Sequence, residues 1–255
     1  MTVVATVGST HPLAFAGLGF ALLALEEDGV RPVCVVAGVT AQDAAHVYAR
    51  QAVEPETIAA QFAALEGAGV AAFHVGALLS ADAVRAVADG LARFAHVPAI
   101  VDPVLAASGG DVLADDATRR ALRELLIPRA TLVTPNLDEA SALLERDVRD
   151  VDAMHEAAGA LIAAGAGAAL VKGGHLAGDP VDVFADAHGS RALHAPRIDG
   201  ILRGTGDLLA ATIAACVASG APLPEAIERA RRRVREAIAR GTTFAGTRVA
   251  VFHAR

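Results

Sequence analysis

Short apolar runs alternate with longer stretches of helical periodicity along most of this chain. The short runs are rich in Val, Ala and Ile and lack polar alternation, which is typical of strands buried on both faces of a sheet. Buried strands are therefore expected at residues 2–7, 33–39, 70–75, 99–101, 131–134 and 168–172. Helices are expected at residues 14–27, 55–65, 81–94, 115–126, 137–144, 151–164, 208–218 and 224–240.

Two further segments complete the pattern. Residues 181–185 and 191–194 predict a hairpin across the turn 186–189, and a final strand is expected near 248–252. Strands that alternate with helices over short connections predict an α/β fold, with a mostly parallel central sheet and helices on both faces. We find no internal repeat, linker or break in composition, so residues 1–255 are expected to form a single domain.

The stretch around which this pattern is organised is Gly204-Thr205-Gly206-Asp207, which leads into the apolar run 208–218. The run leaves no polar face, so its helix is expected to be buried from end to end. Glycines before a helix let backbone N–H groups converge on an anion, and the helix dipole adds to the attraction. A carboxylate beside a phosphate site suits a base that removes a proton from an attacking hydroxyl, which indicates phosphoryl transfer. The alternative is that Asp207 is only a favourable acid in the first turn of the helix.

Polar or small residues follow the apolar strands in turn, where parallel sheets bind their ligands. They are Gln42 with Asp43, Gly76, Asp102, Asn136 with Glu139, and Lys172 with its two glycines. The repetition predicts a site along one rim of the sheet. Two alternatives stay open: Asp102 as a turn cap before Pro103, and Asn136 with Glu139 as a helix capping box.

The composition and net charge of the chain limit the kinds of partner that it is expected to bind. The formal net charge is −7, there is no Trp, and Tyr48 is the single Tyr, which argues against a nucleic-acid partner. Cys34 and Cys216 fall in apolar runs and are expected to be buried as small hydrophobes. The nine histidines show no metal-ligand spacing. His74 ends a predicted strand and His175 lies in the loop after Lys172; the other histidines are interpreted as surface or packing residues. No apolar run is long enough to cross a bilayer and no basic signal start is present, so a cytoplasmic protein without membrane contact is expected.

The order of four rim segments resembles the ribokinase-like superfamily, and within it the hydroxymethylpyrimidine/phosphomethylpyrimidine kinases of thiamine biosynthesis. The segments are Asp102-Pro103-Val104-Leu105, Thr134-Pro135-Asn136-Leu137-Asp138-Glu139-Ala140, Val171-Lys172-Gly173-Gly174-His175 and Gly204-Thr205-Gly206-Asp207. The tail Val251-Phe252-His253-Ala254 is also similar to the family's usual ending. The resemblance covers essentially the whole chain.

This resemblance implies a Mg²⁺- and ATP-dependent kinase that phosphorylates a primary hydroxyl on a small heteroaromatic ring, and a homodimer. The backbone of Gly204, Thr205 and Gly206 would form the anion hole, and Asp207 would be the catalytic base. The resemblance also implies the remaining roles: Asp102, Asn136, Glu139, Lys172 and Gly174 at the nucleotide, Asp102 and Glu139 at the metal, and Gln42, Gly8 and Gly76 at the substrate.

The chain departs from the family pattern at several places. It has Asp207 where the pyrimidine kinases usually carry Cys, as sugar and pyridoxal kinases do. The loop that follows Gly8-Ser9 lacks both of the family's acidic residues, the second replaced by Ala21, and carries bulky Leu13 and Phe15 in place of glycines. A lysine of the family is missing at Ala107-Ser108-Gly109-Gly110, and Ile201-Leu202-Arg203 stands in place of its Asn-Thr-His.

The sequence is therefore compatible with three functions. The first is phosphorylation of 4-amino-5-hydroxymethyl-2-methylpyrimidine, of its monophosphate, or of both. The second is a kinase of the same superfamily for pyridoxal or another small alcohol. The third is a pyrimidine-binding regulatory protein without turnover. The sequence leaves open which alcohol binds, whether a monovalent cation assists and whether activity is retained.

Overall fold

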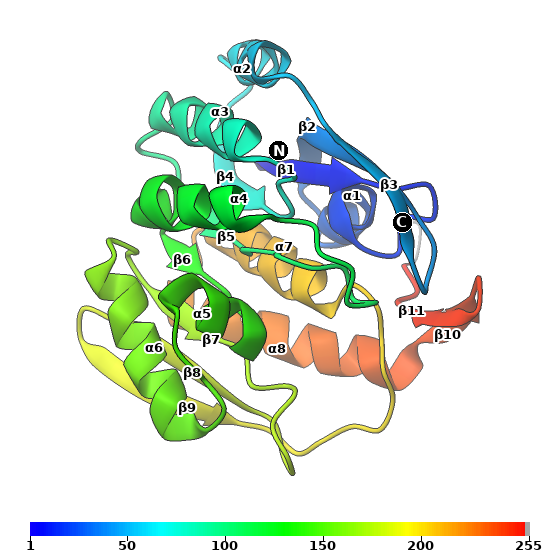
Figure 1. Cartoon of the computed structure of the whole chain (residues 1–255), viewed down its shortest axis with the longest axis vertical. Helices are drawn as coiled ribbons and strands as arrows, with labels where there is room; N and C mark the ends of the chain where they lie inside the picture. The colour runs from blue at the N-terminus through cyan, green and yellow to red at the C-terminus, as the bar shows by residue number, and fades with distance from the viewer. Residues whose placement is uncertain (253–255) are drawn as a thin grey trace.

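The computed structural model describes residues 1–252 and is built on a sheet of nine strands, in the order β3-β2-β1-β4-β5-β6-β7-β8-β9 (Figure 1). Six adjacent strands run parallel to one another. They are β2 (Arg31–Gln42), β1 (Val3–Thr10), β4 (Val70–Val75), β5 (Ala99–Val101), β6 (Leu132–Val133) and β7 (Ala169–Val171). At the edges, β3 (Val47–Ala52) pairs antiparallel with β2, and β8 (Val181–Asp186) pairs antiparallel with both β7 and β9 (Gly189–His194).

Helices cover both faces of this sheet, and each face has its own apolar core. One face carries α2 (Pro55–Ala64), α3 (Ala81–Ala92), α4 (Asp116–Ala121), α5 (Leu137–Leu144) and α6 (Val151–Ala163). A π-helical turn (Leu122–Leu126) and a 3₁₀ turn (Ile127–Arg129) continue α4. The other face carries α1 (Gly17–Glu27), α7 (Thr205–Ala218) and α8 (Leu223–Arg240). The predicted fold class is confirmed.

Helix α7 is the central helix of its face. Ten consecutive residues, from Asp207 to Cys216, are buried in it. It packs on β1, β4 and β5 and against α1 and α8, so it has no side open to water. The expectation of a helix buried along its length is confirmed for these residues, because a run without a polar face can be accommodated only between other elements.

Several helix starts follow their sequence signals. The Ser80 side chain accepts a hydrogen bond from the N–H of Ala83 at 3.1 Å and caps α3, as its place before the helix predicts. Asp115 caps α4 in the same way, through the N–H of Thr118 at 2.8 Å. Most predicted elements end within one or two residues of their observed bounds.

The structure corrects the sequence prediction in the N-terminal third. Strand β1 continues to Thr10 instead of ending at residue 7, and α1 begins at Gly17 instead of residue 14. Strand β2 continues through Gln42, and the edge strand β3 was not predicted. Every residue of β3 is exposed or half-buried, so the strand lacks the buried pattern by which the others were recognised.

Two smaller corrections concern the C-terminal region and the cysteines. A hairpin of β10 (Thr242–Phe244) and β11 (Thr247–Val249) takes the place of the strand expected near 248–252. His253 and Ala254, part of the tail noted in the sequence, lie outside the described residues. Cys216 is buried as expected, but Cys34, near the amino end of β2, is exposed. Between residues 1 and 252, no helix combines the length and apolarity that crossing a membrane requires.

Candidate active site

The carboxyl ends of the parallel strands bring together a buried cluster of charges from distant parts of the chain. Lys172, directly after β7, donates from Nζ to Oδ1 of Asp102 at 2.6 Å and lies 4.0 Å from Oε2 of Glu139. The hydroxyl of Thr134 donates to the same Oδ1 at 2.9 Å. The side chains of Lys172, Asp102 and Glu139 are only 16%, 3% and 9% exposed. Asp102 is thus an ion-pair partner as well as a residue before a proline.

Asn136 and Glu139 form the capping box that the sequence left as an alternative. The N–H of Asn136 donates to Oε2 of Glu139 at 2.7 Å, and the N–H of Glu139 donates to Oδ1 of Asn136 at 2.8 Å. The same Oε2 faces Lys172, so the cap also holds the Glu139 carboxyl group toward the charged cluster. Burial raises the pKa of Glu139 to about 7, against the opposing pull of Lys172.

Asp207 lies in the first turn of α7 and is 8% exposed. Its Oδ2 accepts a hydrogen bond from the backbone N–H of Gly17 at 3.0 Å. A Cβ atom at Gly76 would lie 3.5 Å from its Oδ1, so the backbone after β4 passes beside the carboxylate. Burial and the nearby charge of Asp102 raise the pKa of Asp207 to about 6, which the Gly17 N–H and Lys172 partly oppose. A carboxylate with such a pKa is a stronger base than an exposed one and is still ionised at pH 7.

The glycines before α7 are required by close contacts. Gly204 has a left-handed backbone, with φ of 75°, and a Cβ atom there would lie 2.5 Å from the carbonyl oxygen of Phe15. A Cβ atom at Gly206 would lie 2.9 Å from Oδ2 of Asp102 and 3.3 Å from Nζ of Lys172. The start of α7, whose backbone N–H groups suit it to bind an anion, therefore lies directly against the charged cluster.

A cavity of about 70 Å³ opens beside Asp207. Gln42 lines it, and the hydroxyl of Thr40 donates to Oε1 of that side chain at 2.9 Å. His11 and Arg203 line it as well. Of the residues expected at the substrate, Gln42 thus shares a cavity with the candidate base, whereas the described lining of this cavity does not include Gly8 or Gly76. Gly8 lies against the backbone of Gly76 and of Ala77, and Ala77 lines the cavity.

Gly174 is placed differently from the other expected nucleotide residues. A Cβ atom there would meet no atom within 4 Å, so the backbone is open on that side. Its carbonyl accepts a hydrogen bond from Nη1 of Arg197 at 3.3 Å. The guanidinium of Arg197 also donates to the carbonyls of Leu176 and Gly178, each at 2.6 Å, which fixes the loop after β7.

Sequence reasoning missed several residues of this site. Gly17 and Thr134 contact the two central aspartates, and both contacts join segments that are distant in the chain. His11 and Arg203 line the cavity, although they were noted only as departures or packing residues. Pairing across distant segments leaves no signal in local periodicity, so the sequence alone could not have assigned these contacts.

His74, at the end of a predicted strand, is a buried histidine in the structure. It is 1% exposed, and its Nδ1 pairs with the hydroxyl of Thr6 at 2.9 Å. Burial lowers its pKa to about 4, so the ring is neutral near pH 7.

The donor atoms at the rim fit a divalent cation that arrives with phosphates. Within residues 1–252, no group of three or more His, Cys, Asp or Glu side chains could hold a metal by itself. Mg²⁺ requires only one or two protein carboxylates when phosphate and water oxygens complete its shell. Asp102 directs Oδ1 to Lys172 and Thr134, while its Oδ2 faces Gly206. Asp102 and Glu139 could therefore supply oxygen ligands beside the start of α7.

The fold is that of small-molecule kinases of the ribokinase-like class. The pyridoxal kinase of Bacillus subtilis, solved as an ADP complex, superposes with a TM-score of 0.90, and covers 99% of this chain and 97% of its own at 29% identity. A phosphomethylpyrimidine kinase structure from Clostridium difficile superposes with a TM-score of 0.83, and covers 93% of this chain and 100% of its own at 24% identity.

Sequence comparison places the chain within this class. Residues 13–251 match the phosphomethylpyrimidine kinase family. A hydroxymethylpyrimidine/phosphomethylpyrimidine kinase from Streptomyces coelicolor is 37% identical over 245 residues, which cover 95% of this chain and 91% of the relative. The chain belongs to the phosphomethylpyrimidine kinase family and is a phosphotransferase, so the resemblance stated from the rim motifs is confirmed.

Proposed function

We propose that this chain is an ATP-dependent kinase of thiamine biosynthesis, which phosphorylates 4-amino-5-hydroxymethyl-2-methylpyrimidine, its monophosphate, or both. The family membership supports the reaction. The observation that carries the mechanism is a buried carboxylate, Asp207, placed at the start of α7 and beside a cavity that Gln42 also lines. Its expected form is a cytoplasmic homodimer.

The proposed chemistry begins with the substrate hydroxyl in this cavity. Asp207 accepts the hydroxyl proton, and the alcohol oxygen attacks the γ-phosphorus of ATP in line as the bond to ADP breaks. Gly17 holds the carboxylate through Oδ2, which leaves Oδ1 to take the proton. The backbone N–H groups of Gly204, Thr205 and Gly206 donate hydrogen bonds to the transferred phosphoryl group and stabilise the negative charge that develops on it.

Three carboxylates and one lysine surround this start of α7, so the site favours an added positive charge. Asp102 and Glu139 would hold Mg²⁺ together with the nucleotide phosphates, and the ion would neutralise phosphate charge. Lys172 supplies the protein's own cation there, because Asp102 and Glu139 more than offset the lowering effect of burial and raise the pKa of its amine. Gly174 and Asn136 are assigned to the nucleotide side of the site, and Gly8 and Gly76 to the backbone that supports the substrate.

A second candidate is a pyridoxal-type kinase. It is favoured by Asp207, which stands where pyrimidine kinases usually carry Cys, and by the similarity to a pyridoxal kinase fold. Both candidates use the same base and the same phosphate site, so they differ only in the alcohol.

The test is ADP release by the purified protein with Mg²⁺ and ATP. Hydroxymethylpyrimidine, its monophosphate and pyridoxal are offered in parallel, with the protein without alcohol as the background. Turnover that depends on either pyrimidine is the expected result. Turnover with pyridoxal alone would show that pyridoxal, and not a pyrimidine, is the substrate. ADP release no higher than background with all three alcohols would contradict the proposed kinase activity.

A further inference from the structure

His11 stands out among the buried polar groups of residues 1–252. Three buried side-chain polar atoms in this part of the chain lack a hydrogen-bond partner, and two of them are the ring nitrogens of His11. The residue is 8% exposed. A buried polar atom without a partner is costly, so a ring with two of them calls for an explanation.

The position of His11 links it to the candidate base. It lies in the connection between β1 and α1 and lines the same cavity as Gln42, Arg203 and Asp207. Its ring packs on that of Phe15, with centroids 4.5 Å apart and planes inclined by 55°. Because the carbonyl of Phe15 lies close against Gly204, this connection holds the His11 ring in fixed relation to the start of α7.

The connection is held in shape by its own backbone. The N–H of Ala14 donates to the carbonyl of His11 at 3.3 Å, which closes a tight turn. Ala14 itself adopts a φ of 46°, in the left-handed region that non-glycine residues rarely occupy. Such strain persists only where surrounding contacts impose it, and it is common at ligand sites.

The chemistry of the ring suits a neutral polar partner. Burial lowers the pKa of His11, and the nearby backbone of Ala16 offsets the shift only in part, without a hydrogen bond of normal geometry. The neutral imidazole has one N–H donor and one acceptor nitrogen. A nitrogen heterocycle carries groups of the same two kinds on its edge, whereas the substrate hydroxyl is already matched to Asp207.

We propose that His11 is a specificity-determining residue that hydrogen-bonds a polar group on the heteroaromatic ring of the alcohol substrate. The role rests on the proposed function, because it needs the alcohol to occupy this cavity. Gln42, whose Oε1 is engaged by Thr40, contributes its amide N–H groups to the same ring. The two side chains together select a neutral nitrogen heterocycle over an apolar alcohol of the same size.

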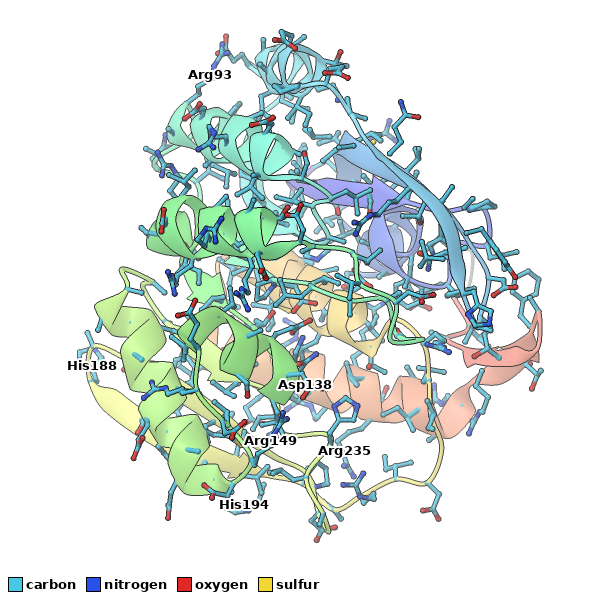
Figure 2. All side chains as sticks on the ribbon, viewed as in Figure 1. Arg93, Asp138, Arg149, His188, His194 and Arg235 are labelled. Atoms are coloured by element: carbon cyan, nitrogen blue, oxygen red, sulfur yellow. The ribbon has the colours of Figure 1, made fainter. Side chains whose placement is uncertain are left out.

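The first test separates binding from chemistry. In His11→Leu, the KM for the pyrimidine alcohol is expected to rise about 10- to 100-fold, while the KM for ATP stays within twofold. His11→Gln keeps a donor and an acceptor and should recover most of this loss. His188→Leu is the matched control, because His188 lies in the exposed turn between β8 and β9 at the edge of the molecule (Figure 2). An unchanged alcohol KM in a folded His11→Leu protein would overturn the role.

The second test needs no variant. The ring signals of His11 are followed by nuclear magnetic resonance while 4-amino-5-hydroxymethyl-2-methylpyrimidine is added without ATP, with His188 as the internal reference. A saturable shift of the His11 ring signals is expected, while those of His188, which is remote from the cavity, stay unchanged. This shift in a protein that does not turn over the pyrimidine would refute the proposed function and keep the role of His11. His11 signals that do not move up to the solubility limit would overturn that role, whether or not turnover occurs.

Discussion

The backbone N–H of Gly17 donates to Oδ2 of Asp207 at 3.0 Å, although the two residues are 190 positions apart in the chain. The bond stabilises the ionised carboxyl group in a buried place, and it fixes the orientation of the candidate base. Gly17 itself has a left-handed backbone, with φ of 67°.

Gly17→Ala is expected to lower kcat by about 10- to 100-fold, because a Cβ atom would lie 2.7 Å from the carbonyl oxygen of Ser9 and push the N–H away from Asp207. Gly67→Ala is the matched control: Gly67 also has a left-handed φ, of 81°, but no atom lies within 4 Å of the added Cβ. Steady-state kinetics of both variants check the prediction. Equal kcat values in the two variants would show that the Gly17 contact is unimportant.

Asp207→Asn is expected to lower kcat by about 10²- to 10⁴-fold, because an amide cannot accept the hydroxyl proton. Calorimetric binding of ADP should persist, since an amide oxygen can still accept the Gly17 N–H. Asp152→Asn is the control for the alternative interpretation, because Asp152 is an exposed acid in the first turn of α6. Comparable activity in the two variants would mean that Asp207 is only a first-turn acid.

The pH dependence of kcat follows from the pKa of Asp207, which is raised to about 6. A base works only when ionised, so kcat should be level above pH 7 and fall about tenfold per pH unit well below pH 6. Single-turnover rates between pH 5 and 8, at saturating ATP and alcohol, measure this. A rate that is constant down to pH 5 would contradict the assignment of Asp207 as the base.

Removing the side-chain charge of Lys172 should destabilise the fold more than removing one partner of an exposed ion pair. Lys172→Met leaves Asp102 and Glu139 buried without a cation, which is expected to lower the free energy of unfolding by about 3–5 kcal/mol at pH 8. The loss should shrink toward pH 5, because Glu139, whose pKa is already about 7 beside Lys172 and rises further without it, then takes up a proton.

The matched control for this experiment is Arg149→Met. Arg149 pairs with Asp138 at 2.5 Å at the surface, where the two side chains are 58% and 76% exposed (Figure 2). Its loss should leave the free energy of unfolding nearly unchanged. Urea denaturation at both pH values gives the comparison, and similar losses in the two variants would show that the Lys172 cluster contributes little to stability.

Arg197 is expected to act through the nucleotide side of the site. Its guanidinium donates to three carbonyls of the loop after β7, and its backbone N–H donates to Asp179 at 2.8 Å. Arg197→Lys cannot make the three guanidinium bonds together, so the KM for ATP should rise about 3- to 30-fold while the KM for the alcohol changes little. An alcohol KM that rises as much as the ATP KM would indicate general loosening of the fold instead.

The parallel core could be predicted because its strands are buried on both faces and read as continuous apolar runs. Strand β4 was predicted with its observed bounds, Val70–Val75, for this reason. The edge strand β3 was missed, because its exposed side chains carry no apolar pattern. The late start of α1 was missed too, since the apolar residues between His11 and Gly17 fold into a turn and not into helix.

The sequence could predict which residues belong to the candidate site, but not which of them contact one another. Asn136 and Glu139 were recognisable because a capping box is a local pattern three residues apart. The contact of Lys172 with Asp102 spans 70 positions and depends on the order of strands in the sheet. Periodicity and spacing carry no information on that order, so the geometry had to come from the structure.

The late position of helix α7 in the sequence also affects how this chain folds during its synthesis on the ribosome. The helix covers β1 and β4, yet it lies more than a hundred residues after both. At about 5–20 residues per second, the face that it covers stays open for roughly 7–30 s after β4 has been made. Before α7 has been synthesised, the chain lacks Asp207, and the N–H of Gly17 lacks this acceptor. A truncated product that stops before α7 therefore cannot turn over ATP by this route.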